Sequence, residues 1–470
     1  MYKLQIIIVC LLFSISGFSQ EVPSSFSLQE AINFALKNNR AVKNANLDIE
    51  AAKKQKWETT AIGLPQINAS IDYQNWLKQQ VSLLPAAAFD NTQSVIEVVN
   101  DYFDANQTNF NVATPEGFIP LSFGTKQNMT ATATLSQLIF DGSYLVGLQS
   151  AKVFLEISKN AKEKTDLEIR KAVINAYGNV LLAEESVNIL EKNKTVLEKN
   201  LYEVTKLYEN GLDEQESVEQ LQITLSSIES NLNNANRLKT LAYQMLNITM
   251  GIDIYNNTTV TENLEDLTQQ HITLALLEAN NDVKNTVDFK IAANEKASKE
   301  LLLKLEKSKA LPTLTAFVNG GYNGNSETFS FADKNQQWYG SSLLGLSLNI
   351  PIFSSGMRSA ATQRAKINLE KSKNDLTEIE QQLKLKLESA KSDYQFAIEE
   401  YNNKKQNLNL AERIEKKNQT KYFEGIGSSF ELRQAQTQLY TAQQELLKSM
   451  LDVITKKAEL ETILNTTTEN

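Results

Sequence analysis

Few side chains in this sequence have the chemistry of a catalytic or metal site. The 470 residues contain one histidine, His271, one cysteine, Cys10, and no glycine-rich phosphate loop. Acidic pairs such as Glu184 and Glu185 fall within helical patterns, where they are typical of solvated faces. A catalytic triad, a metal centre or a nucleotide site needs other convergent groups. We therefore predict that the protein is not an enzyme and binds no metal and no cofactor.

The elements available to position any site are unusually long helices. From Val173 to Tyr208, apolar residues recur at every third and fourth position over about five heptads, which indicates coiled-coil packing. Lys194 is the one interruption. No proline falls between Gly142 and Gly251, and a turn at Gly211 separates a helix of roughly 100 Å from a return helix. Such a helix needs partners of comparable length.

The same pattern recurs 214 positions further along the chain, where Tyr422-Phe-Glu-Gly425 matches the first turn, Tyr208-Glu-Asn-Gly211. A repeat that keeps its register through a turn indicates two copies of one structural unit. We predict a first repeat at residues 21–251, a linking segment at 252–285, a second repeat at 286–464 and a disordered tail at 465–470.

The N-terminal residues 1–20 are predicted to be a signal peptide, because Lys3 precedes a short apolar run that ends in small and polar residues. The alternative is a buried N-terminal strand. The net charge of −9 argues against nucleic acid as a partner. No later stretch approaches 18 consecutive apolar residues, so an exported chain is either soluble or crosses a membrane as β-strands.

Each repeat contains two predicted strands. A helix from Leu28 to about Ile62 precedes the first pair, and a polar loop from Val81 to Lys126, predicted to be extracellular, separates that pair. Alternating polarity over about ten residues fits a membrane β-barrel, although the strands taken alone favour a small soluble sandwich. The predicted strands are Gln66–Trp76, Met129–Phe140, Thr313–Tyr322 and Ser341–Phe353, and the aromatic residues of the predicted membrane girdle are Tyr73, Trp76, Tyr322, Trp338 and Tyr339.

Four strands cannot close a barrel, because the open edges would leave backbone groups unpaired in lipid. If the strands are in a membrane, several chains must contribute, and three chains would supply twelve strands. In that case the chain is expected to form a homo-oligomer in contact with membrane lipid.

The Leu-Pro-strand junctions, the Ile-Phe junctions before Gly142 and Gly356, and the turns at Gly211 and Gly425 resemble the TolC family of outer-membrane efflux proteins. The resemblance implies a mainly α fold with a small β part. In it, long antiparallel coiled-coil helices form a trimeric α-barrel in the periplasm, and four strands per chain complete a 12-stranded transmembrane β-barrel in the cell outer membrane. It also implies a passive exit duct for small molecules or proteins, in a tripartite efflux or type I secretion system with a periplasmic adaptor protein and an inner-membrane transporter.

The turns are the candidate site. The resemblance implies a periplasmic constriction at Glu431, followed by Gln434 where the family often has a second carboxylate. From the residues alone, a carboxylate in the first turn of a helix complements the helix dipole, and a glycine after a helix is a left-handed cap. The turn residues expected to dock the adaptor are Gly211, Leu212, Gly425, Ile426, Gly427 and Ser428.

A second class of protein also fits the helices, namely a secreted coiled-coil scaffold or adhesin without a channel. The four strands with aromatic ends argue against it, because a scaffold does not need lipid-facing alternation. An adaptor subunit is a further alternative, but it would normally carry a lipoyl domain between its hairpin legs, and Gly211 has only a turn.

Overall fold

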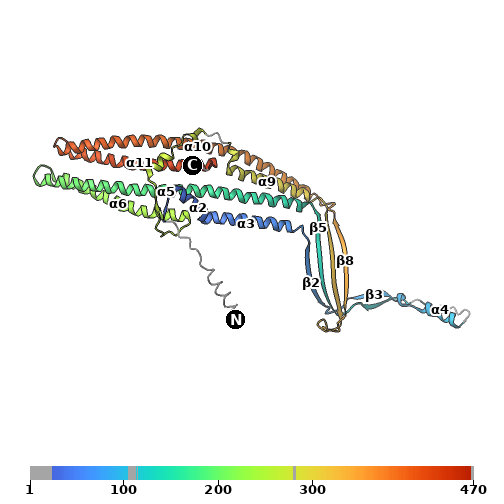
Figure 1. The fold of residues 1–470 in the computed structure, drawn as a ribbon. Coiled ribbons are helices and arrows are strands. Elements are labelled where there is room, and N and C mark those ends of the chain that lie inside the picture. Colours follow the sequence, from blue (N-terminus) through green and yellow to red (C-terminus); the bar gives the residue numbers. More distant parts are fainter. Residues whose placement is uncertain (1–23, 104–112, 114, 279–281, 467–470) are drawn as a thin grey trace, which may run out of the picture. The chain divides into compact units, whose positions relative to one another are not determined.

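The computed structural model describes residues 24–103, 113, 115–278 and 282–466 (Figure 1). The chain divides into two compact units, a helical unit within Met1–Lys56, Gln149–Lys304 and Ala361–Asn470, and a sheet unit of Trp57–Leu148 and Leu305–Ala360. The predicted signal peptide lies outside the described residues, as does the end of the predicted tail. Among the described helices, none combines the length and the apolar character needed to cross a membrane.

Two helical hairpins, related by an offset of 214 residues in the sequence, form most of the helical unit. The first consists of α5 (Gly142–Glu209) and α6 (Gln215–Met250), and the second of α10 (Met357–Phe423) and α11 (Ser429–Leu464). Adding 214 to both bounds of α6 gives the bounds of α11. The return helices both end in a left-handed cap, at Gly251 and at Asn465. The repeat in the sequence is therefore also a repeat in the structure.

Lysines interrupt the apolar seams of the hairpins because each pairs with a carboxylate on the opposite leg. The Nζ atom of Lys194 lies 2.9 Å from Glu229, and that of Lys239 lies 3.0 Å from Glu184. In the second hairpin, Lys404 pairs with Glu445 at 3.1 Å. These partly exposed pairs keep the charges at the border of the seam, so the coiled-coil pattern continues past them.

The helix predicted from Leu28 to about Ile62 is two helices, α2 (Leu28–Asn38) and α3 (Arg40–Ala61), so that prediction is wrong at Asn39. Asn39 has an extended backbone with ψ 137°, and its side-chain amide donates to the carbonyl of Thr249 at 2.7 Å. Next to this contact, Gly251 has φ 83° and a Cβ atom there would lie 2.6 Å from the carbonyl oxygen of Asn38. The tight approach of α2 to the end of α6 breaks the helix.

The linking segment contains short elements that pack on the helical unit. Strand β6 (Thr259–Val260) pairs in parallel with β1 (Ser25–Phe26), and α7 (Leu264–Gln270) follows. The remaining elements of the segment are α8 (Ala275–Glu278) and η3 (Val283–Asn285), and the longer helix α9 (Val287–Ser308) follows the segment.

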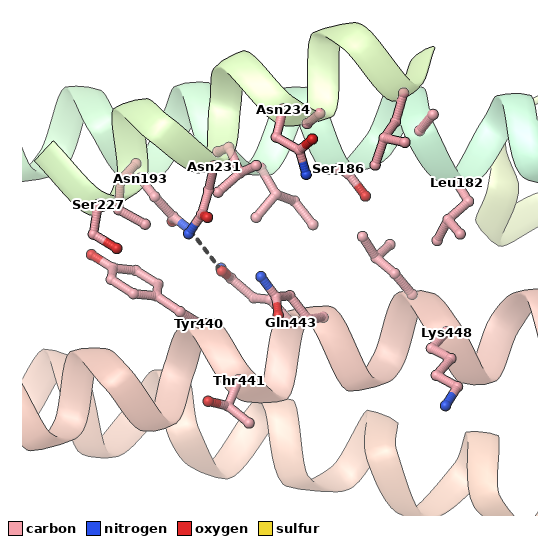
Figure 2. Close-up of a pocket in the computed structure, with 18 of the residues that line it drawn as sticks. Leu182, Ser186, Asn193, Ser227, Asn231, Asn234, Tyr440, Thr441, Gln443 and Lys448 are labelled. Carbon is pink, nitrogen blue, oxygen red and sulfur yellow. Dashed lines mark hydrogen bonds between the residues drawn. The ribbon is translucent and has the colours of Figure 1, made fainter. Parts of the chain in front are cut away.

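An open groove of about 1010 Å³ lies between the first hairpin and α11 (Figure 2). Its lining is mixed, since apolar residues such as Leu182 alternate with the amides of Asn231 and Asn234. The side chains of Asn193 and Gln443 meet across it, with Nδ2 donating to Oε1 at 2.8 Å.

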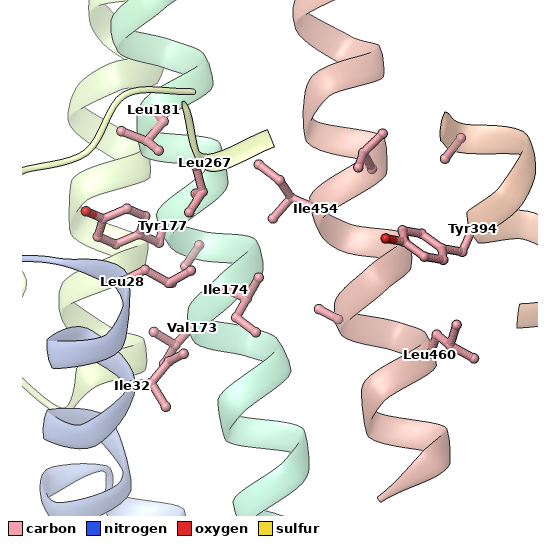
Figure 3. Close-up of a cluster of buried hydrophobic side chains, with 14 of the residues drawn as sticks. Leu28, Ile32, Val173, Ile174, Tyr177, Leu181, Leu267, Tyr394, Ile454 and Leu460 are labelled. Carbon is pink, nitrogen blue, oxygen red and sulfur yellow. The ribbon is translucent and has the colours of Figure 1, made fainter. Parts of the chain in front are cut away.

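The largest buried cluster lies beside this groove and joins both repeats (Figure 3). It contains Tyr177 of α5, whose hydroxyl donates to the carbonyl of Phe26 at 3.0 Å, and Tyr394 of α10, whose hydroxyl donates to the carbonyl of His271. Ile454 of α11 is fully buried in the same cluster. Leu264 and Leu267 of the linking segment belong to the same cluster, so this segment packs on helices of both repeats.

Beside the cluster, His271 is only partly exposed. Its Nδ1 atom lies 2.8 Å from the carbonyl oxygen of Leu267, which accepts a hydrogen bond when the neutral imidazole carries its hydrogen on Nδ1. Burial, and then the positive charge of Lys457, lower the pKa of His271 from 6.5 to about 4. The folded protein therefore holds this imidazole neutral.

We expect His271 to make unfolding pH-dependent. Because its folded pKa is below its unfolded value, its contribution is fully present above pH 6.5 and is lost as the pH falls from 6.5 to about 4. The loss amounts to about 3 kcal/mol. Denaturant midpoints measured across this range should fall less in His271→Gln than in the unsubstituted protein. Equal slopes would contradict this expectation.

The sheet unit contains a four-stranded antiparallel sheet in the order β2-β5-β7-β8. The strands are β2 (Gln66–Asn75), β5 (Gln127–Asp141), β7 (Thr313–Ser326) and β8 (Trp338–Asn349). The pairing of β5 with β7 joins the two repeats, and β2 and β8 are the edge strands.

The polar loop predicted from Val81 to Lys126 contains secondary structure that the prediction lacks. Strand β3 (Val81–Pro85) pairs with β4 (Phe118–Ser122). Between them lie the 3₁₀ helix η2 (Ala86–Phe89) and the helix α4 (Thr92–Phe103).

Candidate functional site

The sheet has one apolar and one polar face, because side chains alternate along each strand and the register aligns like with like. Ile71 of β2 pairs with Ala131 of β5, which pairs with Tyr322 of β7. The same row-by-row alignment places further apolar side chains on this face: Ile67, Ala133, Leu135, Val318, Leu344, Leu346 and Leu348. Most of them are exposed. An exposed apolar face of this size needs a cover other than water.

Hydroxyl and amide groups dominate the opposite face and bond across the strands. Ser70 and Thr132 lie 3.0 Å apart, and the amide of Asn319 donates to the hydroxyl of Thr134 at 2.9 Å. On the same face the ring of Phe317 lies over Gly345, where a Cβ atom would approach to 2.5 Å. This face is therefore suited to contact with water.

Three of the predicted girdle residues lie on the apolar face, namely Tyr73, Tyr322 and Trp338, and two of these belong to an aromatic cluster. The ring centroid of Phe331 lies 5.9 Å from that of Tyr73 and 6.1 Å from that of Trp338. Tyr339 follows Trp338 in the strand and lies on the polar face. Trp76 lies beyond the end of β2, where its N–H donates to Lys126 at 2.9 Å. Tyr339 and Trp76 are therefore left out of the girdle that we propose below.

The predicted tip residues close the two hairpins in the same way. Gly211 and Gly425 have φ of 72° and 76°, and each is followed by an N–H that bonds back five residues, from Leu212 to Leu207 and from Ile426 to Lys421. This is the Schellman type of helix end. The side chains of Leu212 and Ile426 are 74% and 72% exposed, so both turns present an apolar residue to their surroundings.

The residues after the second turn have a local role that the structure makes explicit. The hydroxyl of Ser428 accepts from the N–H of Glu431 at 3.2 Å, and the Glu431 carboxylate accepts from the N–H of Ser428 at 3.3 Å. This is a capping box, which stabilises the start of α11. Gln434, one turn further on, is exposed.

Contacts between the two hairpin ends were not predicted from the sequence. The hydroxyl of Tyr422 in α10 donates to the carboxylate of Asp213 in the first turn, and Gln419 donates to Asn200 at 3.3 Å. Burial, and then the Asp213 carboxylate, raise the pKa of Tyr422. The repeat had placed Tyr422 on a seam, but a partner from the other hairpin has no sequence signal. These hydrogen bonds hold the two turns together within one chain.

In the described part of the chain, no group of three or more histidine, cysteine, aspartate or glutamate side chains could hold a metal ion.

Solved structures of similar fold include outer-membrane channels. The chain is similar to CusC, with 17% identity, a TM-score of 0.70 and 95% of each chain covered. It is also similar to VceC of Vibrio cholerae (15% identity, TM-score 0.67, 93% of this chain and 96% of that one) and to the CmeC outer membrane channel of Campylobacter jejuni (16%, 0.68, 96% and 90%). A comparison with curated protein sequences gives no match. The fold class is therefore that of outer-membrane channels with long helical hairpins and a small sheet.

The sequence profile of the family described as outer membrane efflux protein matches residues 31–251 and 283–466. Because the match covers well over half of the sequence, the chain belongs to this family. The protein is thus an efflux channel of the cell outer membrane that extends into the periplasm, as the resemblance implied. The family is one of channels and not of enzymes, and the scaffold without a channel is excluded.

Proposed function

We propose that three copies of this chain form one passive exit duct. In this arrangement the β2 edge of each sheet pairs with the β8 edge of the next, the twelve strands close a barrel, and the hairpins form a helical tunnel in the periplasm. The observation that carries the proposal is the two-faced sheet with two open edges, because closure of the edges satisfies the backbone and puts the apolar face in lipid. The proposed girdle is Tyr73, Tyr322 and Trp338, and the first 20 residues are the proposed signal peptide.

Conductance in a planar lipid bilayer tests the proposal. Purified protein, added at a concentration at which a trimer is present, should produce discrete conductance steps without any energy source. A protein that binds the bilayer but produces no steps would contradict a duct of this kind.

The hairpin ends are proposed to dock a periplasmic adaptor that connects the duct to an inner-membrane transporter. The support is the exposure of Leu212 and Ile426 on rigid turns, next to the Gly427 and Ser428 backbone. We expect Leu212→Asp combined with Ile426→Asp to abolish export while the trimer remains folded, since buried carboxylates would be introduced into the docked interface. Leu212→Ala with Ile426→Ala is the milder control. Intact export by the double aspartate variant would refute docking through these residues.

Glu431 is proposed to contribute one carboxylate per chain to a constriction, so that three negative charges face one another. Its capping box holds the carboxylate next to the turn, and Gln434 adds no charge. We expect Glu431→Gln to reduce the preference for cations severalfold in bilayer measurements of reversal potential, because glutamine retains a side-chain acceptor for Ser428 but carries no charge. Unchanged selectivity would restrict Glu431 to its role as a cap.

A further inference from the structure

The helix α4 carries an apolar arc that has no cover among the described residues. At about 100° per residue, its apolar side chains fall within one arc of about 160°. The members of this α4 arc are Val95, Ile96, Val98, Val99, Tyr102 and Phe103, and all except Ile96 are exposed. Glu97 and Asp101 lie on the opposite side. A helix of 12 residues is marginal on its own in water, so its stability requires that the arc be packed against something.

Strands β3 and β4 form a β-hairpin that carries α4 between them, and this β-hairpin continues from the β2 edge of the four-stranded sheet. The N–H of Trp76, just after β2, donates to Lys126 at 2.9 Å, and the side-chain amide of Gln79 donates to Gly124 at 3.2 Å. Strands β3 and β4 then extend this ladder towards α4. Because β2 is the edge strand that pairs with the next copy in the proposed duct, α4 lies next to a boundary between copies.

The charge of the hairpin indicates which partner fits. Residues 79–125 contain no lysine or arginine and have five acidic side chains, Asp90, Glu97, Asp101, Asp104 and Glu116. Helices that lie on membrane surfaces usually carry lysine and arginine on their polar face, so a lipid surface is a poor match. Copies of α4 packed arc to arc around a symmetry axis would bury the apolar residues and turn the acidic sides outwards.

We propose that the α4 helices of neighbouring copies pack on one another through the α4 arc and form a helical collar at the outer end of the duct. The inference rests on the proposed trimer. The occupant of each arc is a second copy of this chain, and the interface continues the strand pairing between β2 and β8.

Disulfide trapping tests the collar in the full-length protein. The only cysteine, Cys10, lies in the proposed signal peptide and can be changed to serine. In that background, Val95→Cys and Val99→Cys place a thiol near the centre of the α4 arc, whereas Glu97→Cys places one on the acidic side of the same helix. Cells expressing each variant are treated with an oxidant, and samples are run on denaturing gels without reductant and, separately, unheated to score the trimer.

We expect at least one arc variant to give disulfide-linked dimers in about tenfold higher yield than Glu97→Cys, because a disulfide requires Cα atoms within about 7 Å. Absence of linked dimers in both arc variants, with the trimer intact, would overturn the collar. Labelling with a membrane-impermeant maleimide would then show whether the arc is bare or is covered by lipid or by another protein, and both results contradict a second copy as the occupant. Absence of the trimer in the unsubstituted protein would instead refute the proposed duct, and the collar with it.

Discussion

Leu346→Arg is expected to prevent most of the protein from reaching the outer membrane in a folded form. Leu346 lies on the apolar face of β8 and is 73% exposed, and the proposal places it in contact with lipid. An arginine on the lipid face of a barrel costs about 2–4 kcal/mol at the bilayer midplane. Three copies would each contribute this cost to one assembly. The amount of heat-modifiable trimer in outer-membrane fractions measures the effect.

The matched control is the next residue. Ser347 pairs with Thr315 on the polar face, where the proposal places water. We expect Ser347→Arg to leave the trimer close to its normal amount and to alter conductance instead. Equal losses for the two arginine variants would contradict the assignment of one face to lipid and the other to the duct.

Glu461→Gln is expected to cause the largest loss of stability in the helical unit. Glu461 is 4% exposed, and its carboxylate lies 2.6 Å from Nη1 of Arg170 and 3.7 Å from Nζ of Lys457. Burial already lowers the pKa of Lys457, although the Glu461 charge opposes the shift. Removal of the carboxylate leaves two cations without their partner in a site with little water, at a cost of about 3–5 kcal/mol. This loss of stability is measured as the shift in the denaturant midpoint of unfolding, followed by the circular dichroism signal of the helices in detergent.

Glu459→Gln is the control for this prediction. Glu459 pairs with Lys456 at 3.5 Å, and its side chain is 42% exposed. Exposed ion pairs contribute little to stability, so we expect Glu459→Gln to change the free energy of unfolding by no more than about 0.5 kcal/mol. If Glu461→Gln and Glu459→Gln unfold at the same denaturant concentration, the buried ion pair is not a major support of the fold.

The elements with strong periodicity were predictable from the sequence. The long hairpins follow from apolar spacing, which is a local property repeated over many turns, and their offset of 214 residues is the one that the helix bounds show. The strands were also found, because the alternation of Leu344, Leu346 and Leu348 with small polar residues persists through β8. The family and the location were predicted from these patterns together with the turn motifs, and the match to the family profile confirms both.

Features that depend on contacts between distant residues were not predictable. The break at Asn39 arises from the approach of α6, and the helical pattern on both sides of it gives no sign of the interruption. Tyr422 and Asp213 are 209 positions apart, and only the packing of the two hairpins brings them together. The helix α4 was missed because its 12 residues lie within a polar, acidic segment whose composition resembles a loop. For the break at Asn39 and for the pair of Tyr422 and Asp213, the tertiary structure, and not the local pattern, decides the outcome.

Native mass spectrometry of the protein released from detergent micelles tests the central claim most directly. The open β2 and β8 edges and the exposed apolar face predict a complex of three chains that persists after the detergent is removed in the gas phase. A folded single chain, stable in water without detergent, would show that the sheet needs no neighbouring copies and would contradict the proposed duct.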